Sequence, residues 1–164
     1  MITRRTILSA SAVAAITVAA TVVSTEGPLS AEGPLGARAQ AKEERLALKG
    51  YDPVAYFTLS TPTPGVAEYE IVHDGVRYRF ANARHLELFK ANPDKYTPQF
   101  GGSCAMNMSN GIRREADPTV WVISNGSLYV FAGAGGAERF RQNPDTAAAR
   151  AATNWKTLKN TPSQ

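Results

Sequence analysis

Two stretches of this chain share one pattern: GVRYRFANARHLELFKANPD at residues 75–94 and GSLYVFAGAGGAERFRQNPD at residues 126–145. Aligned without a gap at an offset of 51 positions, they agree at ten of twenty residues. Chance agreement would be about one residue, since each residue type makes up roughly a twentieth of an average protein. A fixed register of this kind indicates two copies of one supersecondary unit.

Each copy carries the sequence signals of a hairpin followed by a helix. The turn dipeptides are Asp74-Gly75 and Asn125-Gly126, and each stands between runs of β-favouring residues. These dipeptides supply the two positive φ angles that a type I′ turn needs. Helices are predicted over 83–91 and 134–142, and each ends at an Asn-Pro pair that starts the next helical turn.

The sequence therefore predicts a small single α+β domain built from two pseudo-symmetric ββα repeats. Repeat 1 covers about 66–97, repeat 2 covers about 119–159, and residues 98–118 connect them. One ββα unit has too little apolar surface to fold alone, so the two are expected to pack into one core. Ahead of repeat 1, residues 42–48 are expected to form a helical turn that ends at Gly50.

Residues 1–41 have the pattern of an export signal followed by a linker. Arg4 and Arg5 precede a modestly apolar run at residues 9–23, which is typical of a twin-arginine signal peptide. The run is too short and too rich in Ala, Ser and Thr for a membrane span, which needs about 20 apolar residues. An uncleaved N-terminal anchor is the alternative. The folded part, residues 42–164, is expected in the periplasm or another extracytoplasmic compartment, without a membrane span after signal removal.

The charge pattern argues against nucleic acid as a partner. The chain has 18 basic and 14 acidic residues, a net charge of +4, and the basic residues are scattered among the acidic ones. No Ser/His/Asp set and no pair of carboxylates stands out, so no catalytic residue is predicted. The glycine-rich stretch 133–136 lacks the Lys-Ser/Thr ending of a phosphate-binding loop.

Sulfur-bearing side chains are concentrated in one short segment. Cys104 is the only cysteine of the chain, and Met106 and Met108 follow it. Thiolate and thioether groups are the ligands that select Cu(I). A strand would place all three on one face, whereas a helix would pair Cys104 with Met108 and turn Met106 away. The Gly-Gly before the segment and the Asn-Gly after it favour the helix. Plain core packing is the competing interpretation, because cysteine and methionine are common core residues.

Four patterns carry a resemblance to a known family. They are GYDPVAYF at residues 50–57, the hairpin 75–80, the pattern from Phe89 to Tyr96, and FGGSCA at residues 100–105. Together they resemble the YHS domain family, and most closely its exported bacterial branch with twin-arginine signals. The resemblance extends over residues 49–159 and implies a loose association with heavy-metal chemistry.

This chain departs from the metal-binding relatives of that family. Positions where those relatives have cysteines hold Ala55, Ala81 and His85 here, so a four-thiolate site is not carried over. His85 is kept as a candidate ligand because it occupies a ligand position of the family. Tyr51 and Asp52 are candidates to line a ligand site, although an Asp-Pro pair more often has a structural role.

Three functional hypotheses follow from these residues. The first is a non-catalytic extracytoplasmic protein that binds a soft metal, with copper as the expected ion, through Cys104 with Met108, Met106 or His85. The alternative is an interaction module in which Cys104 only packs and a pocket between the repeats holds a small ligand or a protein partner. A thiol-based redox enzyme is disfavoured, because the chain has no second cysteine to resolve an oxidised one.

Overall fold

The computed structural model describes residues 45–164, which lie within one compact unit. The predicted export signal and linker, residues 1–41, lie outside the described residues. Helices and strands both contribute to the described part, so the expected small single α+β domain is confirmed. Along residues 45–164, no helix is both long and apolar enough to cross a bilayer.

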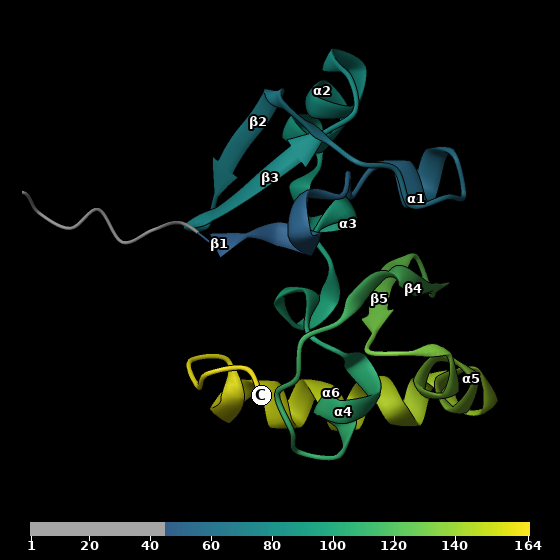
Figure 1. Cartoon of the computed structure of the whole chain (residues 1–164). Helices are drawn as coiled ribbons and strands as arrows, with labels where there is room; N and C mark the ends of the chain where they lie inside the picture. Colours follow the sequence, from purple (N-terminus) through teal and green to yellow (C-terminus); the bar gives the residue numbers. More distant parts are fainter. Residues whose placement is uncertain (1–44) are drawn as a thin grey trace, which may run out of the picture. The chain divides into compact units, whose positions relative to one another are not determined.

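The first part of the domain is a three-stranded sheet with short helices around it (Figure 1). In the sheet, β3 lies between β1, which runs parallel to it, and β2, which runs antiparallel. The elements in chain order are β1 (Arg45–Leu46), the single turn η1 (Ala47–Gly50), α1 (Ala55–Thr58), β2 (Val66–His73), β3 (Val76–Phe80), α2 (Ala83–Ala91) and α3 (Pro93–Tyr96).

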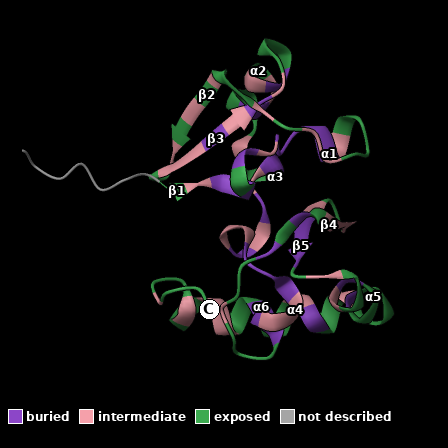
Figure 2. Cartoon of the chain, in the orientation of Figure 1, coloured by how far each residue is buried: buried purple, intermediate pink, exposed green. Residues whose placement is uncertain are grey.

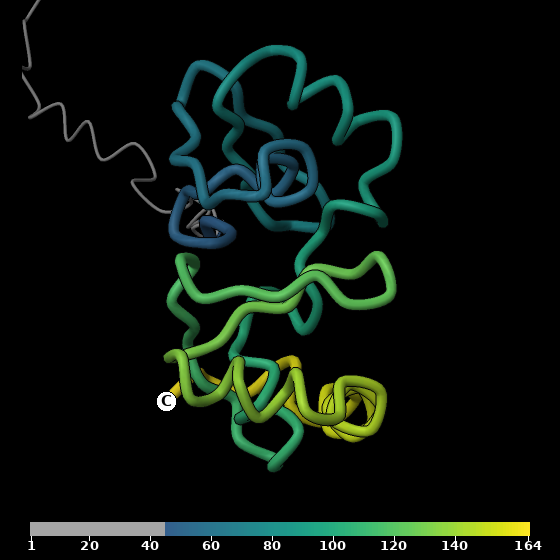
Figure 3. Tube along the Cα trace, turned by 90° about the vertical axis from the view of Figure 1, so that its right-hand side faces the viewer, coloured from purple at the N-terminus to yellow at the C-terminus, as the bar shows by residue number. Residues whose placement is uncertain are grey.

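The second part is a two-stranded antiparallel hairpin packed against three helices. The β4–β5 hairpin lies between the first part and the helices α5 and α6 in Figures 1 and 3. Its elements are the single turn η2 (Gln99–Gly102), α4 (Ala105–Ser109), β4 (Asp117–Ser124), β5 (Ser127–Phe131), α5 (Ala134–Gln142) and α6 (Pro144–Leu158).

Both predicted hairpins form with the predicted turns. Asp74 and Gly75 have φ angles of 50° and 69°, and Asn125 and Gly126 have φ angles of 50° and 72°. Two successive residues with positive φ define a type I′ turn, so this prediction is confirmed. The helices α2 and α5 also have the predicted bounds.

The same aromatic arrangement follows each hairpin. In each part, one phenylalanine of the helix contacts two rings of the preceding strand. The centroid distances are 4.8 Å for Tyr78–Phe89, 5.2 Å for Phe80–Phe89, 4.7 Å for Tyr129–Phe140 and 5.2 Å for Phe131–Phe140. Element order and aromatic contacts thus match between the two parts. That one part is a copy of the other stays a prediction.

The buried residues form two clusters and not the single expected core, which is a correction (Figure 2). One cluster lies between the first hairpin and α2, the other between the second hairpin, α4, α5 and α6. Each hairpin packs against the phenylalanine of the helix that follows it. Phe57 packs against both clusters. Flanking segments supply the apolar surface that a bare ββα unit lacks, including Tyr56 and Phe100.

The expected helical turn before Gly50 is also wrong in its described part. Arg45 and Leu46 form β1, which pairs with β3. Leu48 and Lys49 then adopt left-handed φ angles of 47° and 52°, which no right-handed helix accommodates. Pairing with the edge of β3 outweighs the local helical preference.

The connector between the predicted repeats, residues 98–118, begins with a left-handed turn like the one at residues 47–50. Phe100 and Gly101 of η2 have left-handed φ angles of 53° and 59°, like Leu48 and Lys49 of η1. An isolated antiparallel bridge follows each turn, joining Tyr51 to Pro64 and Ser103 to Glu115. A short helix begins within four residues of each bridge, α1 in the first part and α4 in the second.

Candidate functional site

The sulfur-bearing segment forms the predicted helix, and its sulfurs are enclosed. Cys104 is the N-cap residue of α4, and its carbonyl accepts the first hydrogen bond of the helix from the amide of Met108 at 2.9 Å. Asn110 ends the helix, as expected from the Asn-Gly pair. Cys104 is 1% exposed and Met108 is fully buried in the second cluster. The thiol of Cys104 donates to Oδ1 of Asn107 at 3.1 Å.

Met106 faces another part of the domain. Met106 is partly exposed and lies next to α5: a Cβ added to Gly136 of that helix would be 3.6 Å from the Cβ of Met106. Its sulfur is 3.9 Å from the hydroxyl of Ser109. The pairing of Cys104 with Met108 on the inner face, without Met106, agrees with the helical alternative from the sequence.

His85 does not join these sulfurs. It lies on α2, and Figure 1 shows α2 and α4 on opposite sides of the β4–β5 hairpin. Its ring is held by two residues of the first part: Nδ1 is 2.6 Å from Oδ2 of Asp52, and Nε2 is 3.2 Å from Oγ1 of Thr58. Within residues 45–164 no group of three His, Cys, Asp or Glu side chains is placed to hold a metal ion. Of the predicted ligands, His85 thus lies apart from Cys104, Met106 and Met108.

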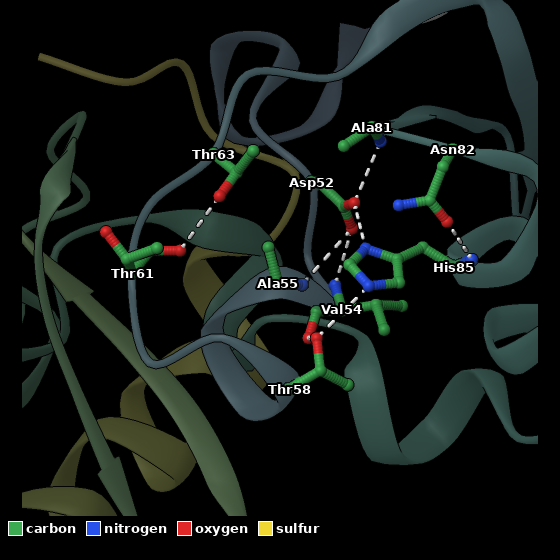
Figure 4. A network of polar contacts seen from close by, with 9 residues as sticks. All are labelled: Asp52, Val54, Ala55, Thr58, Thr61, Thr63, Ala81, Asn82 and His85. Atoms are coloured by element: carbon green, nitrogen blue, oxygen red, sulfur yellow. Dashed lines mark hydrogen bonds and ion pairs between the residues drawn. The ribbon is translucent and has the colours of Figure 1, made fainter.

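Asp52 is the centre of a buried polar network (Figure 4). Its Oδ1 accepts hydrogen bonds from the amides of Val54 at 2.8 Å and Ala55 at 3.3 Å. Its Oδ2 accepts from the amide of Ala81 at 2.9 Å and from Nδ1 of His85 at 2.6 Å. An ionised carboxylate offers about four acceptor positions, so all are filled. The network joins the start of α1 to the end of β3 and to α2.

Asp52, His85 and Thr58 are arranged in the order of a catalytic triad, with a carboxylate, an imidazole and a hydroxyl. Their hydrogen bonds nevertheless join segments of the fold. The hydroxyl of Thr58 has one proton and two acceptors within reach, the carbonyl of Val54 at 3.1 Å and Nε2 of His85 at 3.2 Å, so the backbone carbonyl competes with the imidazole. The sequence did not indicate this set, because Asp52 and His85 come from distant elements. The Asp-Pro pattern did predict that Asp52 accepts backbone donors, and that prediction is confirmed.

Tyr51 and Asp52 do not line one site. Asp52 is fully buried and its acceptor positions are taken, so it has no group left for an outside ligand. Tyr51 is partly buried, bridges to Pro64 and packs against the second cluster.

A pocket of about 320 Å³ opens where β1, η1, η2, the approach to β4 and the C-terminal segment meet. Its lining contains three cationic side chains, and one of them, Lys49, pairs with Glu115 at 3.6 Å. Burial, and next the charge of Arg45, lower the pKa of Arg113. The described residues that line it are Arg45, Leu46, Leu48, Lys49, Gly102, Ser103, Arg113, Glu115, Ala116, Pro118, Pro162 and Ser163.

The sequence missed this pocket, because its basic residues are scattered along the chain and follow no local pattern. Comparison with protein-family models, with curated proteins and with solved structures finds no match to this chain. The function is therefore argued from the chain's own geometry.

Proposed function

We propose that this chain is an exported, non-catalytic binding module. A small ligand occupies the pocket bounded by residues 45–49, 102–103, 113–118 and 162–163, and Cys104 is a core residue. The pocket carries the proposal: its described lining comes from four separated segments of the chain, and its volume is that of a small-molecule site, which is about 300–1,000 Å³.

The surroundings of Cys104 support a packing role. Cys104 follows η2 and precedes α4, just as Asp52 follows η1 and precedes α1. Asp52 at that place ties backbone segments together, whereas Cys104 fills an apolar cluster. A thiol that is 1% exposed and donates to Asn107 behaves as a small core side chain with a satisfied donor.

Export and family membership are part of the same proposal. The support for export to an extracytoplasmic compartment is the Arg4-Arg5 pair with the apolar run after it. The support for a YHS-like domain is the resemblance over residues 49–159.

Copper binding is the second candidate, favoured by one observation. Cys104 and Met108 share the inner face of α4, where a thiolate and a thioether could hold Cu(I). The ion would have to displace Asn107 from the thiol and open the cluster around Met108.

Thiol accessibility and Cu(I) titration separate the two candidates. The metal-free protein is reacted with a maleimide, in parallel with an Ala149→Cys variant made in a Cys104→Ala background, whose thiol stands on the exposed side of α6. Cys104 should react at least about 100-fold more slowly than the cysteine at position 149, because the structure must first open locally to expose it. Each factor of ten in rate corresponds to about 1.4 kcal/mol of free energy for that opening.

The copper arm uses a chromophoric Cu(I) chelator as competitor. Wild type and Cys104→Ala should compete equally weakly. Fast labelling of Cys104, together with copper binding that disappears in Cys104→Ala, would overturn the proposed function in favour of the metal site.

A further inference from the structure

We infer that the pocket is an anion site, in which Arg45 and Arg113 bind a carboxylate or phosphate group beside Trp155. This inference rests on the proposed function, because it names the class of ligand for the same pocket. The argument uses the charge of the lining, the environment of Arg113 and the position of the indole.

Positive charge dominates the described lining. Arg45, Lys49 and Arg113 line the pocket with Glu115 as the acidic residue among them. Lys49 and Glu115 form a solvent-exposed pair and offset each other. Among residues 45–164, neither Arg45 nor Arg113 has a carboxylate within ion-pair distance. The two guanidinium charges are therefore left without an anionic partner from this part of the chain.

Folding brings these two charges close enough to disfavour each other. The pKa of Arg113 is lowered first by burial and second by the charge of Arg45. Both effects penalise the charged form of a group that stays charged under ordinary conditions. A bound anion would remove the mutual repulsion and replace the lost hydration, since a nearby opposite charge favours the charged form.

Arg113 also retains a donor that no described residue accepts. Its Nη1 donates to the carbonyl of Thr161, whereas its Nε is buried without an acceptor among residues 45–164. Buried polar groups are nearly always hydrogen-bonded, so such a donor calls for a partner. Guanidinium donors form a planar fork that matches the oxygens of carboxylates and phosphates.

Trp155 contacts one of the two arginines and lies near the other. The guanidinium of Arg113 lies over the indole at 5.6 Å from the ring centre. A Cβ at Gly101 would be 3.2 Å from the indole and 3.3 Å from Nη2 of Arg45, so both groups lie on the side of this residue that carries no side chain. The φ angle of Gly101 is +59°, which also favours glycine there. The indole therefore lies near both guanidinium groups.

Calorimetric titration of the full chain with inorganic phosphate and, separately, with citrate tests the inference. Both titrations are run at constant ionic strength set by chloride, so that general screening is unchanged. The phosphate arm and the citrate arm distinguish a phosphate ligand from a carboxylate ligand. Saturable binding of at least one probe is expected.

Three matched glutamine substitutions assign the binding to the pocket. Arg45→Gln and Arg113→Gln should each weaken binding by about tenfold or more, since a charge-assisted hydrogen bond contributes at least about one factor of ten. Arg84→Gln removes the same charge from the exposed side of α2 and should leave binding unchanged. Arg113→Lys keeps the charge without the fork and should bind more weakly than wild type, which covers the case in which Arg113→Gln fails to fold.

No saturable binding of either probe by folded wild type, or an equal loss in Arg84→Gln, would overturn the inference. Such a result leaves the proposed function standing if Cys104 stays unreactive and copper does not bind. Conversely, a reactive, copper-binding Cys104 would refute the proposed function whatever the anion titration shows.

Discussion

Replacing Asp52 by alanine tests whether one buried carboxylate holds the first part of the domain together. The carboxylate is fully buried and accepts from three backbone amides and one imidazole. Alanine would leave all four donors without an acceptor in a region closed to water. The damage would therefore extend to α1, the end of β3 and α2 at once.

The expected loss of stability is about 4 kcal/mol. A buried donor that loses its acceptor costs about 1–3 kcal/mol, and Asp52→Ala leaves several such donors at once. The contact between Oδ1 and the amide of Ala55 is long at 3.3 Å, so its loss adds little. This is a large share of the roughly 5–15 kcal/mol that stabilises an ordinary domain.

Asp52→Asn provides an intermediate step. It keeps Oδ1 for the amides of Val54 and Ala55 but directs an amide N–H group at the backbone N–H of Ala81. We expect it to lose about 2 kcal/mol, the cost of one buried donor left unpaired.

Urea unfolding followed by circular dichroism measures both variants against wild type. The control is Asp94→Ala, which removes an exposed carboxylate from α3 and should leave the midpoint near that of wild type. A shift in midpoint at constant slope reports stability directly. The reasoning fails if Asp52→Ala unfolds at the same urea concentration as Asp94→Ala with an unchanged slope.

The same measurement applies to two glycines and one tyrosine. Gly126→Ala should cost about 1 kcal/mol, because φ is +72° but the added Cβ meets no atom within 4 Å. Gly65→Ala should cost clearly more, because its Cβ would be 2.5 Å from a backbone atom of Arg79; equal costs would contradict this packing. Burial and then nearby acidic groups raise the pKa of Tyr56, whose hydroxyl donates to the carbonyl of Pro118 at 2.8 Å. The unfolded chain therefore releases this proton first, near pH 10, and folding stability falls as pH rises further. Tyr56→Phe should lose about 1 kcal/mol at neutral pH and show a shallower decline above about pH 10; an identical decline would exclude Tyr56 as its source.

Much of the local structure was predictable, because its causes lie within a few residues of chain. The hairpin turns need positive φ at Asp74-Gly75 and Asn125-Gly126, and those residue types state the requirement directly. The start of α3 is likewise encoded by Asn92, whose side chain accepts from the amide of Lys95 at 3.2 Å. The α4 helix, with Cys104 and Met108 on its inner face, follows from the same reasoning.

The predicted metal set shows where such reasoning ends. Sequence placed Cys104, Met106, Met108 and His85 together because of their chemistry, but chemistry does not determine distance. The structure puts His85 beside Asp52 and Thr58, in a hydrogen-bonded tie with no sulfur in it.

The sequence by itself determined the two hairpins, their turns and the helices that follow them, because these depend on neighbouring residues and on the alternation of apolar and polar side chains. Tertiary structure alone decided that the apolar residues form two clusters, that Arg45 and Arg113 line one pocket, and that Arg113 packs on Trp155. The reason is that like charges brought together by distant segments leave no periodic trace in the chain. The pairing of β1 with β3 places Arg45, and the packing of Arg113 on Trp155 of α6 places Arg113.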